Sequence, residues 1–312
     1  MAHPRRFRFG IQLSTAPSGD AWAALARKAE DLGYSTLFMP DHFGDHLAPM
    51  PALMAAADAT TELRVGALVF DNDYKHPVVL AKEMATIDVL SGGRLEVGLG
   101  AGWMASDYEQ SGIPYDKPGV RVSRMEEGIA VIKGCFAPGP FSFEGEHYAI
   151  TGYDAKPKAV QTPHPPFLIG GGAKRVLSIA AREAQIIGIN PSIHSGRVDA
   201  AAAQDGAADV TDQKLQWVKE AAGDGYADLE INMLQFAGIV TDDRKGTAEM
   251  MAPLFGLPPE ELETYPHACI GTVEEIADSI RYRRERWDVS YIVFQGDTMD
   301  SMAPVVAALR DT

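Results

Sequence analysis

Short apolar segments alternate with amphipathic segments along the first hundred residues of the chain. The apolar segments are rich in β-branched and aromatic residues, and the amphipathic segments place an apolar residue at every third or fourth position. This alternation predicts strand–helix units whose strands run parallel. The four predicted strands of this half span residues 7–13, 36–39, 63–69 and 94–99.

The second half continues the alternation, but longer polar segments interrupt it. The capping box Thr272-Val-Glu-Glu275 predicts the start of a helix. Further strands are predicted at residues 167–169, 186–189, within 229–240 and at 291–294. Insertions follow the fourth, sixth and seventh predicted strands, at about 136–166, 190–210 and 241–270.

Eight strands with intervening helices predict an α/β fold, a closed (β/α)8 TIM barrel that forms a single domain over residues 1–312. The first insertion is expected to contain a β-hairpin around Glu144-Gly145-Glu146. The run 198–209, rich in Ala and Asp, is expected to be mobile. Ligands bind such barrels at the C-terminal ends of the strands, so residues directly after the strands are the candidates for chemistry.

The acidic balance of the chain argues against nucleic acid as a partner. Lysine and arginine number 28 against 43 aspartates and glutamates, a formal charge of −15, and an acidic surface repels phosphate backbones. No apolar run approaches the roughly 20 residues that span a bilayer, and the basic N-terminus leads into a predicted strand rather than a signal-peptide core. We therefore expect a cytoplasmic protein without a membrane partner. Cys135 and Cys269 form no CxxC pair, so neither a disulfide framework nor a thiolate metal site is predicted.

The pair Asp41-His42 follows the second predicted strand, and His46 lies four residues further on. Histidine titrates nearest neutrality and a carboxylate fixes its tautomer, so this pair suits a proton donor or the recognition of a polar ring. The alternative is structural, with Asp41 capping a turn and His42 an ordinary polar residue. The histidines at 42, 46 and 76 lack the i, i+4 spacing of helical zinc motifs, so no metal site is predicted.

Two glycine-rich segments follow other predicted strands. Residues 98–103 read GxGxG rather than the GxGxxG of dinucleotide sites, and their glycines either let the backbone approach a flat ligand ring or relieve crowding at the barrel rim. Gly170, Gly171, Gly172 and Ala173 lead into a predicted helix, whose first N–H groups and dipole favour an anion. This second segment is the predicted site of a cofactor phosphate, with a plain tight turn as the alternative.

In their order and spacing, these segments resemble the luciferase-like flavin monooxygenase superfamily. The closer likeness is to its branch that uses coenzyme F420, a deazaflavin. The stretches that carry the resemblance are Phe38-Met-Pro-Asp-His-Phe43, Val65-Gly-Ala-Leu-Val69, His76-Pro77, Leu90-Ser-Gly-Gly-Arg94, Gly98-Leu-Gly-Ala-Gly-Trp103 and Leu168-Ile-Gly-Gly-Gly172.

The resemblance implies roles for particular residues. It places Asp41 and His42 at the deazaflavin ring, with the histidine near the site of hydride transfer. It puts a non-proline cis peptide at Ala67-Leu68, in a bulge against the face of the ring and next to Phe70. The residues implied to flank the ring are Ala101 and Gly102, and those implied to bind the phosphate are Gly170, Gly171, Gly172 and Ala173.

Two departures from the family bear on the reaction. Its sugar-phosphate dehydrogenases carry a catalytic glutamate directly after the GxGxG loop and a tryptophan shortly after the histidine, where this chain has Trp103 and His46. We therefore expect a reductase that passes hydride from reduced F420 to a small organic substrate. Trp103 and His46 are expected in the substrate pocket, with His42 or His46 as proton donor. The alternatives are an FMN-dependent monooxygenase that uses reduced flavin and O2, and a non-catalytic flavin-binding protein. The resemblance also implies a homodimer.

Overall fold

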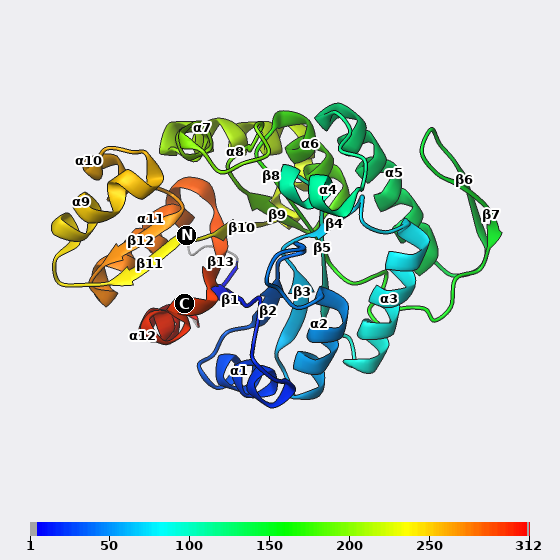
Figure 1. The fold of residues 1–312 in the computed structure, drawn as a ribbon, viewed down its shortest axis with the longest axis horizontal. Coiled ribbons are helices and arrows are strands. Elements are labelled where there is room, and N and C mark those ends of the chain that lie inside the picture. The colour runs from blue at the N-terminus through cyan, green and yellow to red at the C-terminus, as the bar shows by residue number, and fades with distance from the viewer. Residues whose placement is uncertain (1–4, 311) are drawn as a thin grey trace.

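The computed structural model describes residues 5–310 and residue 312. Eight parallel strands close into a barrel in the order β3-β2-β1-β13-β10-β9-β8-β5, and β5 pairs with β3 to complete the ring. The helices surround these strands (Figure 1). The barrel strands are β1 (Arg8–Gln12), β2 (Thr36–Met39), β3 (Arg64–Ala67), β5 (Leu95–Gly100), β8 (Phe167–Gly171), β9 (Ile186–Ile189), β10 (Glu230–Leu234) and β13 (Val289–Gln295). The predicted (β/α)8 barrel is therefore confirmed.

The barrel strands are short apolar runs because both of their faces are covered, the outer face by helices and the inner face by other strands. Strands β2, β5 and β9 are buried along their whole length. The bounds of β2 and β9 match the segments that the sequence predicts. A further two-residue strand, β4 (Phe70–Asp71), follows β3 after an interruption and pairs with the end of β5.

Each outer helix packs an apolar face against the strands. Helix α1 (Gly19–Asp31) buries Trp22, Ala26 and Ala29, which lie three or four positions apart. The other helices are α2 (Pro49–Asp58), α3 (Pro77–Leu90), α4 (Ala105–Ser111), α5 (Pro118–Phe136), α6 (Lys174–Glu183), α8 (Ala208–Ala222), α11 (Val273–Trp287) and α12 (Met299–Leu309), with short 3-10 turns η1 (Gly223–Asp228) and η2 (Gly296–Thr298). Within the part of the chain that the structure describes, no helix is long and apolar enough to cross a membrane.

The first two insertions add small elements beside the barrel. The first forms an antiparallel hairpin of β6 (Phe141–Glu144) and β7 (Ala149–Tyr153), as the sequence predicts, and it projects from one side of the molecule (Figure 1). The second contains α7 (Ala200–Asp205), where the sequence predicts a mobile run. This helix forms because the Asp199 side chain caps its N-terminus by accepting a hydrogen bond from the N–H of Ala202.

The third insertion is a small subdomain with its own apolar cluster. The insertion contains α9 (Arg244–Phe255), α10 (Pro259–Leu262) and most of β12 (Ala268–Gly271), and β12 pairs in parallel with β11 (Ala237–Val240), which directly precedes the insertion, apart from the barrel sheet. The segment 229–240, predicted to hold the seventh barrel strand, therefore contains two strands, of which only β10 belongs to the barrel.

An ion cluster fills the N-terminal end of the barrel. The buried Glu96 carboxylate accepts hydrogen bonds from Arg8 at 2.5 Å, Arg64 at 2.9 Å and the Tyr291 hydroxyl at 3.1 Å. Burial opposes ionisation of Glu96, but the two guanidinium groups outweigh it and lower the pKa of this carboxyl. Because this end of such barrels serves stability, the opposite end is where a functional site is expected.

Candidate active site

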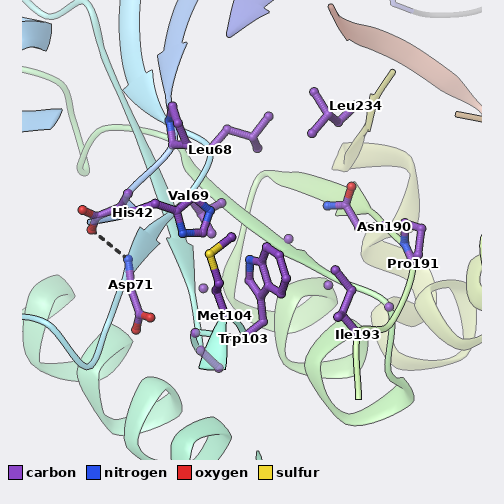
Figure 2. A pocket seen from close by; sticks show the side chains of 18 of the residues that line it. His42, Leu68, Val69, Asp71, Trp103, Met104, Asn190, Pro191, Ile193 and Leu234 are labelled. Atoms are coloured by element: carbon purple, nitrogen blue, oxygen red, sulfur yellow. Dashed lines mark hydrogen bonds between the residues drawn. The ribbon is translucent and has the colours of Figure 1, made fainter. Parts of the chain in front are cut away.

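A pocket of about 520 Å³ opens at the C-terminal ends of the barrel strands. This volume lies within the range of about 300–1,000 Å³ that is typical of small-molecule and cofactor sites. In the view of Figure 2, His42 lies on the left, Asn190 and Leu234 lie on the right, and Trp103 stands between them. The pocket therefore collects residues that lie at or directly after the ends of β2, β5, β9 and β10.

His42 is held by a carboxylate that is distant in the sequence. Its Nδ1 atom lies 2.6 Å from Oδ2 of Asp107, which is carried by α4. The Asp107 side chain is 6% exposed and also accepts hydrogen bonds from the Tyr74 hydroxyl and the Phe43 N–H. These contacts fix the orientation of the imidazole ring, because its Nδ1 faces the Asp107 carboxylate.

Asp41 has a different partner from the one its sequence position suggests. Its carboxylate accepts a hydrogen bond from the Asp71 N–H at 3.1 Å, which joins the end of β2 to β4. Burial raises the pKa of Asp41 above its usual range. The carboxylate that fixes His42 is therefore Asp107, and the prediction that the neighbouring Asp41 does so is wrong. Both Asp41 and His42 line the pocket.

Asp71 is a buried carboxyl group at the base of the pocket. Its oxygens accept hydrogen bonds from the Asp73 N–H at 2.9 Å and from the Tyr108 hydroxyl at 2.8 Å. Burial raises the pKa of Asp71 to about 7 and outweighs the two hydrogen bonds, which lower it; the nearby carboxylates of Asp73 and Asp41 add smaller contributions that raise it. Asp71 therefore exchanges a proton near neutral pH.

A bulge after β3 forms one wall of the pocket. The non-proline cis peptide joins Leu68 and Val69, so its prediction at Ala67-Leu68 is wrong by one residue, because regular pairing with β2 extends through Ala67. Leu68 and Val69 line the pocket, and Gln12 donates a hydrogen bond to the Leu68 carbonyl at 3.0 Å. Ala67 and Phe70 are buried in the strands and do not reach the pocket surface.

The glycine loop after β5 forms the floor next to this wall. Ala101 and Gly102 both line the pocket. Gly102 has φ +71°, and a Cβ atom there would lie 1.8 Å from the Tyr108 hydroxyl, so only glycine fits. The buried Arg121 side chain donates hydrogen bonds to the carbonyls of Ala101 and Gly102, each at 3.2 Å. Arg121 therefore fixes the backbone of the glycine loop.

The second glycine segment also reaches the pocket, where Gly170, Gly171, Gly172 and Ala173 are all lining residues. Ala173 is the N-cap of α6, and no side chain caps this helix. A Cβ atom on Gly172 would lie 2.4 Å from the backbone nitrogen of Ser192, so the turn packs closely against the segment after β9. Arg175 points to α5, where it contacts the Gly119 carbonyl and Ser123.

The two residues that depart from the sugar-phosphate dehydrogenases lie beside His42. The Trp103 ring meets the His42 ring edge-on with 5.6 Å between ring centroids, and the His46 ring lies 6.0 Å from that of His42. Both side chains line the pocket, and His46 is exposed to solvent. The predicted site residues at the ends of β2, β5 and β8 therefore lie around one pocket.

Sequence reasoning did not identify several of the residues that line or support the pocket. These residues are Gln12, Asp71, Asp107, Asn190, Leu234 and Phe236. The position of Asn190 directly after the strand predicted at residues 186–189 was a usable signal. Asp107 lies on α4, a short helix within a loop, and no local pattern marks it as a partner of His42.

Comparisons with known proteins place this barrel in a family. The sequence profile of the luciferase-like monooxygenase family matches residues 6–212. An FMNH2-dependent dimethylsulfone monooxygenase from Pseudomonas putida is 36% identical over 131 residues, which cover 42% of this chain and 35% of that protein. A 5,10-methylenetetrahydromethanopterin reductase from Methanopyrus kandleri is 27% identical over 196 residues, which cover 59% of this chain and 55% of that protein. The match thus spans about a third and about half of the lengths of these two relatives.

Solved structures agree with the sequence match. The coenzyme F420-dependent tetrahydromethanopterin reductase from Methanopyrus kandleri superimposes with a TM-score of 0.78 at 18% identity, over 97% of each chain. An F420-dependent secondary alcohol dehydrogenase, solved with an F420-acetone adduct, also gives 0.78 at 17% identity, over 98% of this chain and 100% of that one. Since the profile covers most of the barrel and the fold matches throughout, the chain belongs to the luciferase-like monooxygenase family.

Proposed function

We propose that the chain is an oxidoreductase that binds coenzyme F420 in this pocket and passes hydride from the reduced coenzyme to a small organic substrate. The observation that carries the proposal is His42, which lines the pocket with Nδ1 2.6 Å from Asp107. Hydride addition to one end of a C=C, C=N or C=O bond leaves the other end in need of a proton. A histidine held by a carboxylate supplies that proton.

The pocket fits a flat ring with a phosphate-bearing tail. The side chains of Leu68 and Val69 offer an apolar wall, and the glycine loop at Gly102 leaves the adjoining floor free of side chains. The first amides of α6 carry no side-chain cap, which suits them to a phosphate. Leu68, Val69 and Gly102 would therefore contact the ring, and residues 170–173 would hold the phosphate.

The residues of the chain would donate the proton and exclude water, while the cofactor would supply the hydride. When bound, a reduced deazaflavin supplies the hydride. His42 in its protonated form donates the proton to the substrate atom that becomes negatively charged, and Asp107 stabilises the imidazolium before that transfer. Trp103 covers the substrate beside His42 and excludes water. Solvent returns the proton to His42 after the product leaves.

A second candidate function is an FMN-dependent monooxygenase that uses reduced flavin and O2. The relative that favours it is the FMNH2-dependent monooxygenase, which is 36% identical to this chain over the matched residues. F420 is favoured by the similarity to the coenzyme F420-dependent tetrahydromethanopterin reductase of known structure, and a methylenetetrahydromethanopterin reductase from the same organism is 27% identical over a longer match. Both cofactors have a tricyclic ring and a phosphate, so the same wall, floor and phosphate turn serve either one.

A single-turnover measurement without oxygen tests the reaction. Protein and reduced F420 are mixed with electron-poor C=C and C=O compounds, and the absorbance of oxidised F420 is followed. We expect protein-dependent oxidation that slows about 100-fold in His42→Ala and is unchanged in the control variant His76→Ala, which changes an exposed histidine outside the pocket lining. No oxidation of F420 in this measurement, together with oxygen consumption when the protein and FMNH2 are mixed in a separate aerobic assay, would establish the monooxygenase instead. Cofactor binding without turnover of any acceptor would favour a flavin-binding protein.

A further inference from the structure

An aromatic side chain outside the predicted site is exposed inside the pocket. Phe236 follows β10 and lines the pocket together with Leu234, and 41% of its surface is exposed. An apolar ring of this size is normally buried, since burying it is favourable by about 1.5–3 kcal/mol. Exposure of Phe236 inside a cavity therefore indicates a surface that a ligand covers.

The Phe236 ring is held rigidly from behind. It stacks on the imidazole of His267, with 5.1 Å between centroids and 25° between the ring planes. His267 is itself fixed, because its Nδ1 lies 2.9 Å from the Leu234 carbonyl and its own carbonyl accepts a hydrogen bond from the Phe236 N–H at 2.7 Å. Burial lowers the pKa of His267 to about 3, so this supporting ring is uncharged at neutral pH.

The position of Phe236 places it away from the predicted ring wall. In the barrel order, β10 lies four strands from β3, so the residues after these two strands face each other across the mouth. Leu234 and Phe236 therefore stand opposite Leu68 and Val69, and Figure 2 shows Leu234 across the pocket from these two residues. Ile193 lies on the same side as Leu234 and adds a further apolar surface.

The charges around the pocket disfavour an anionic substrate. Among the described residues that line it, Arg121 is the only lysine or arginine. Its guanidinium group already donates to the carbonyls of Ala101, Gly102 and Asp116. The carboxyl groups of Asp41 and Asp71 lie in the same lining, and the chain as a whole carries a formal charge of −15. A carboxylate or phosphate on the substrate would therefore lose its hydration without meeting a free cation among these lining residues.

We propose that the substrate is an uncharged, planar, largely apolar carbonyl compound, and that Phe236 determines this specificity by stacking on its ring. The assignment rests on the proposed function for the identity of the reaction. The apolar surface of Phe236, Leu234 and Ile193 binds the body of the substrate, and the carbonyl group lies toward His42. Aromatic stacking on a fixed ring favours a planar partner over an aliphatic one of the same size.

Two probes with one ring system test the assignment. 2-Acetylnaphthalene carries a neutral carbonyl group, and 2-naphthoate carries an anionic carboxylate on the same ring. Binding of each to the cofactor-free full chain is measured by calorimetry, with wild type, Phe236→Leu and Phe236→Trp. The control is Tyr282→Leu, which removes an aromatic ring that is 53% exposed on α11. Thermal unfolding of each variant checks that the fold is retained.

We expect 2-acetylnaphthalene to bind about tenfold more tightly than 2-naphthoate, since the anion meets no free cation among the described lining residues and loses its hydration. Phe236→Leu weakens the ketone about 3- to 10-fold, whereas Phe236→Trp and Tyr282→Leu leave its affinity unchanged. Equal affinity for the two probes, or an unchanged affinity in Phe236→Leu, would overturn the assignment. Because no cofactor is present, these outcomes are independent of the proposed reaction, whose failure would appear only as absent turnover with F420.

Discussion

The Nδ1 atom of His42 lies 2.6 Å from Oδ2 of Asp107, although 65 positions separate the two residues in the chain. We predict that Asp107→Asn lowers kcat about 100-fold, because the uncharged amide no longer stabilises the imidazolium that donates the proton. The affinity for the cofactor should change less than about threefold, since Asp107 lies behind the histidine. Steady-state kinetics and cofactor titration measure the two effects.

The exposed Asp45, three residues after His42, provides the matched control for that variant. Asp45→Asn also replaces one carboxylate by an amide, but in the loop that carries His42 and away from the His42–Asp107 pair. Its kcat should equal that of wild type. If Asp107→Asn and Asp45→Asn had the same kcat, the ion pair would have no part in proton donation.

Lys214 on α8 is expected to anchor the pocket wall after β9. Its buried ammonium group donates to the Asn190 carbonyl at 3.0 Å and to Asp205 at 2.5 Å, and the same Asp205 carboxylate accepts from the Ser192 N–H. We predict that Lys214→Met lowers the free energy of unfolding by about 3 kcal/mol, because it leaves these acceptors without their buried cation. Urea unfolding measures the loss.

The exposed pair Lys28–Asp300 gives the comparison for that measurement. Lys28→Met should change the free energy of unfolding by less than about 1 kcal/mol, as is usual for an ion pair at the surface. Similar losses in Lys28→Met and Lys214→Met would contradict a special contribution of the buried ammonium.

Asp71 should make stability depend on pH in an unusual direction. Burial raises its pKa from 3.8 to about 7, so between pH 4 and pH 7 the folded state binds a proton that the unfolded state has lost. Stability from this group is therefore present at low pH and is lost as pH rises through 7. We predict that the free energy of unfolding of Asp71→Asn, taken relative to that of wild type, rises by about 2–3 kcal/mol from pH 5 to pH 8, because only the wild type loses stability over this range. Urea unfolding curves at the two pH values measure this change. An equal difference at the two pH values would show that Asp71 is ionised throughout.

Gly102 should tolerate no side chain. A Cβ atom would lie 1.8 Å from the Tyr108 hydroxyl and 2.3 Å from the Asp71 carboxylate, at φ +71°. We predict that Gly102→Ala shifts the loop, lowers the free energy of unfolding by about 1–3 kcal/mol and weakens cofactor binding about tenfold. Gly119→Ala is the control, because nothing lies within 4 Å of its Cβ position. Wild-type cofactor affinity in Gly102→Ala would remove the loop from the binding site.

The sequence predicted the barrel well because its information is local. Strands such as Thr36–Met39 and Ile186–Ile189 are uninterrupted apolar runs between turn signals, and the structure has them with the same bounds. The strand Ala268–Gly271 was not predicted, because it has only four residues, two of them Ala and Gly, and lies at the end of a long insertion. Its pairing with Ala237–Val240 depends on a contact that no periodicity marks.

The site was predictable to the extent that it follows barrel strands. His42, Gly102 and the glycine turn at residues 170–173 reach one pocket because strand ends converge there. The partner of His42 was not predictable, because Asp107 reaches it only after a loop folds into α4. Phe236 was missed for a related reason, since its exposure depends on His267, which belongs to the third insertion.

The cofactor assignment is tested by titration of cofactor-free protein with F420 and with FMN, followed by tryptophan fluorescence, which includes that of Trp103 in the pocket. We predict that one F420 binds per chain with a Kd of about 1 μM or below, and that FMN binds at least about tenfold more weakly. Gly172→Ala should weaken both, because its Cβ atom would lie 2.4 Å from the Ser192 nitrogen and displace the phosphate turn. Tight binding of FMN with no binding of F420 would contradict the assignment of the cofactor.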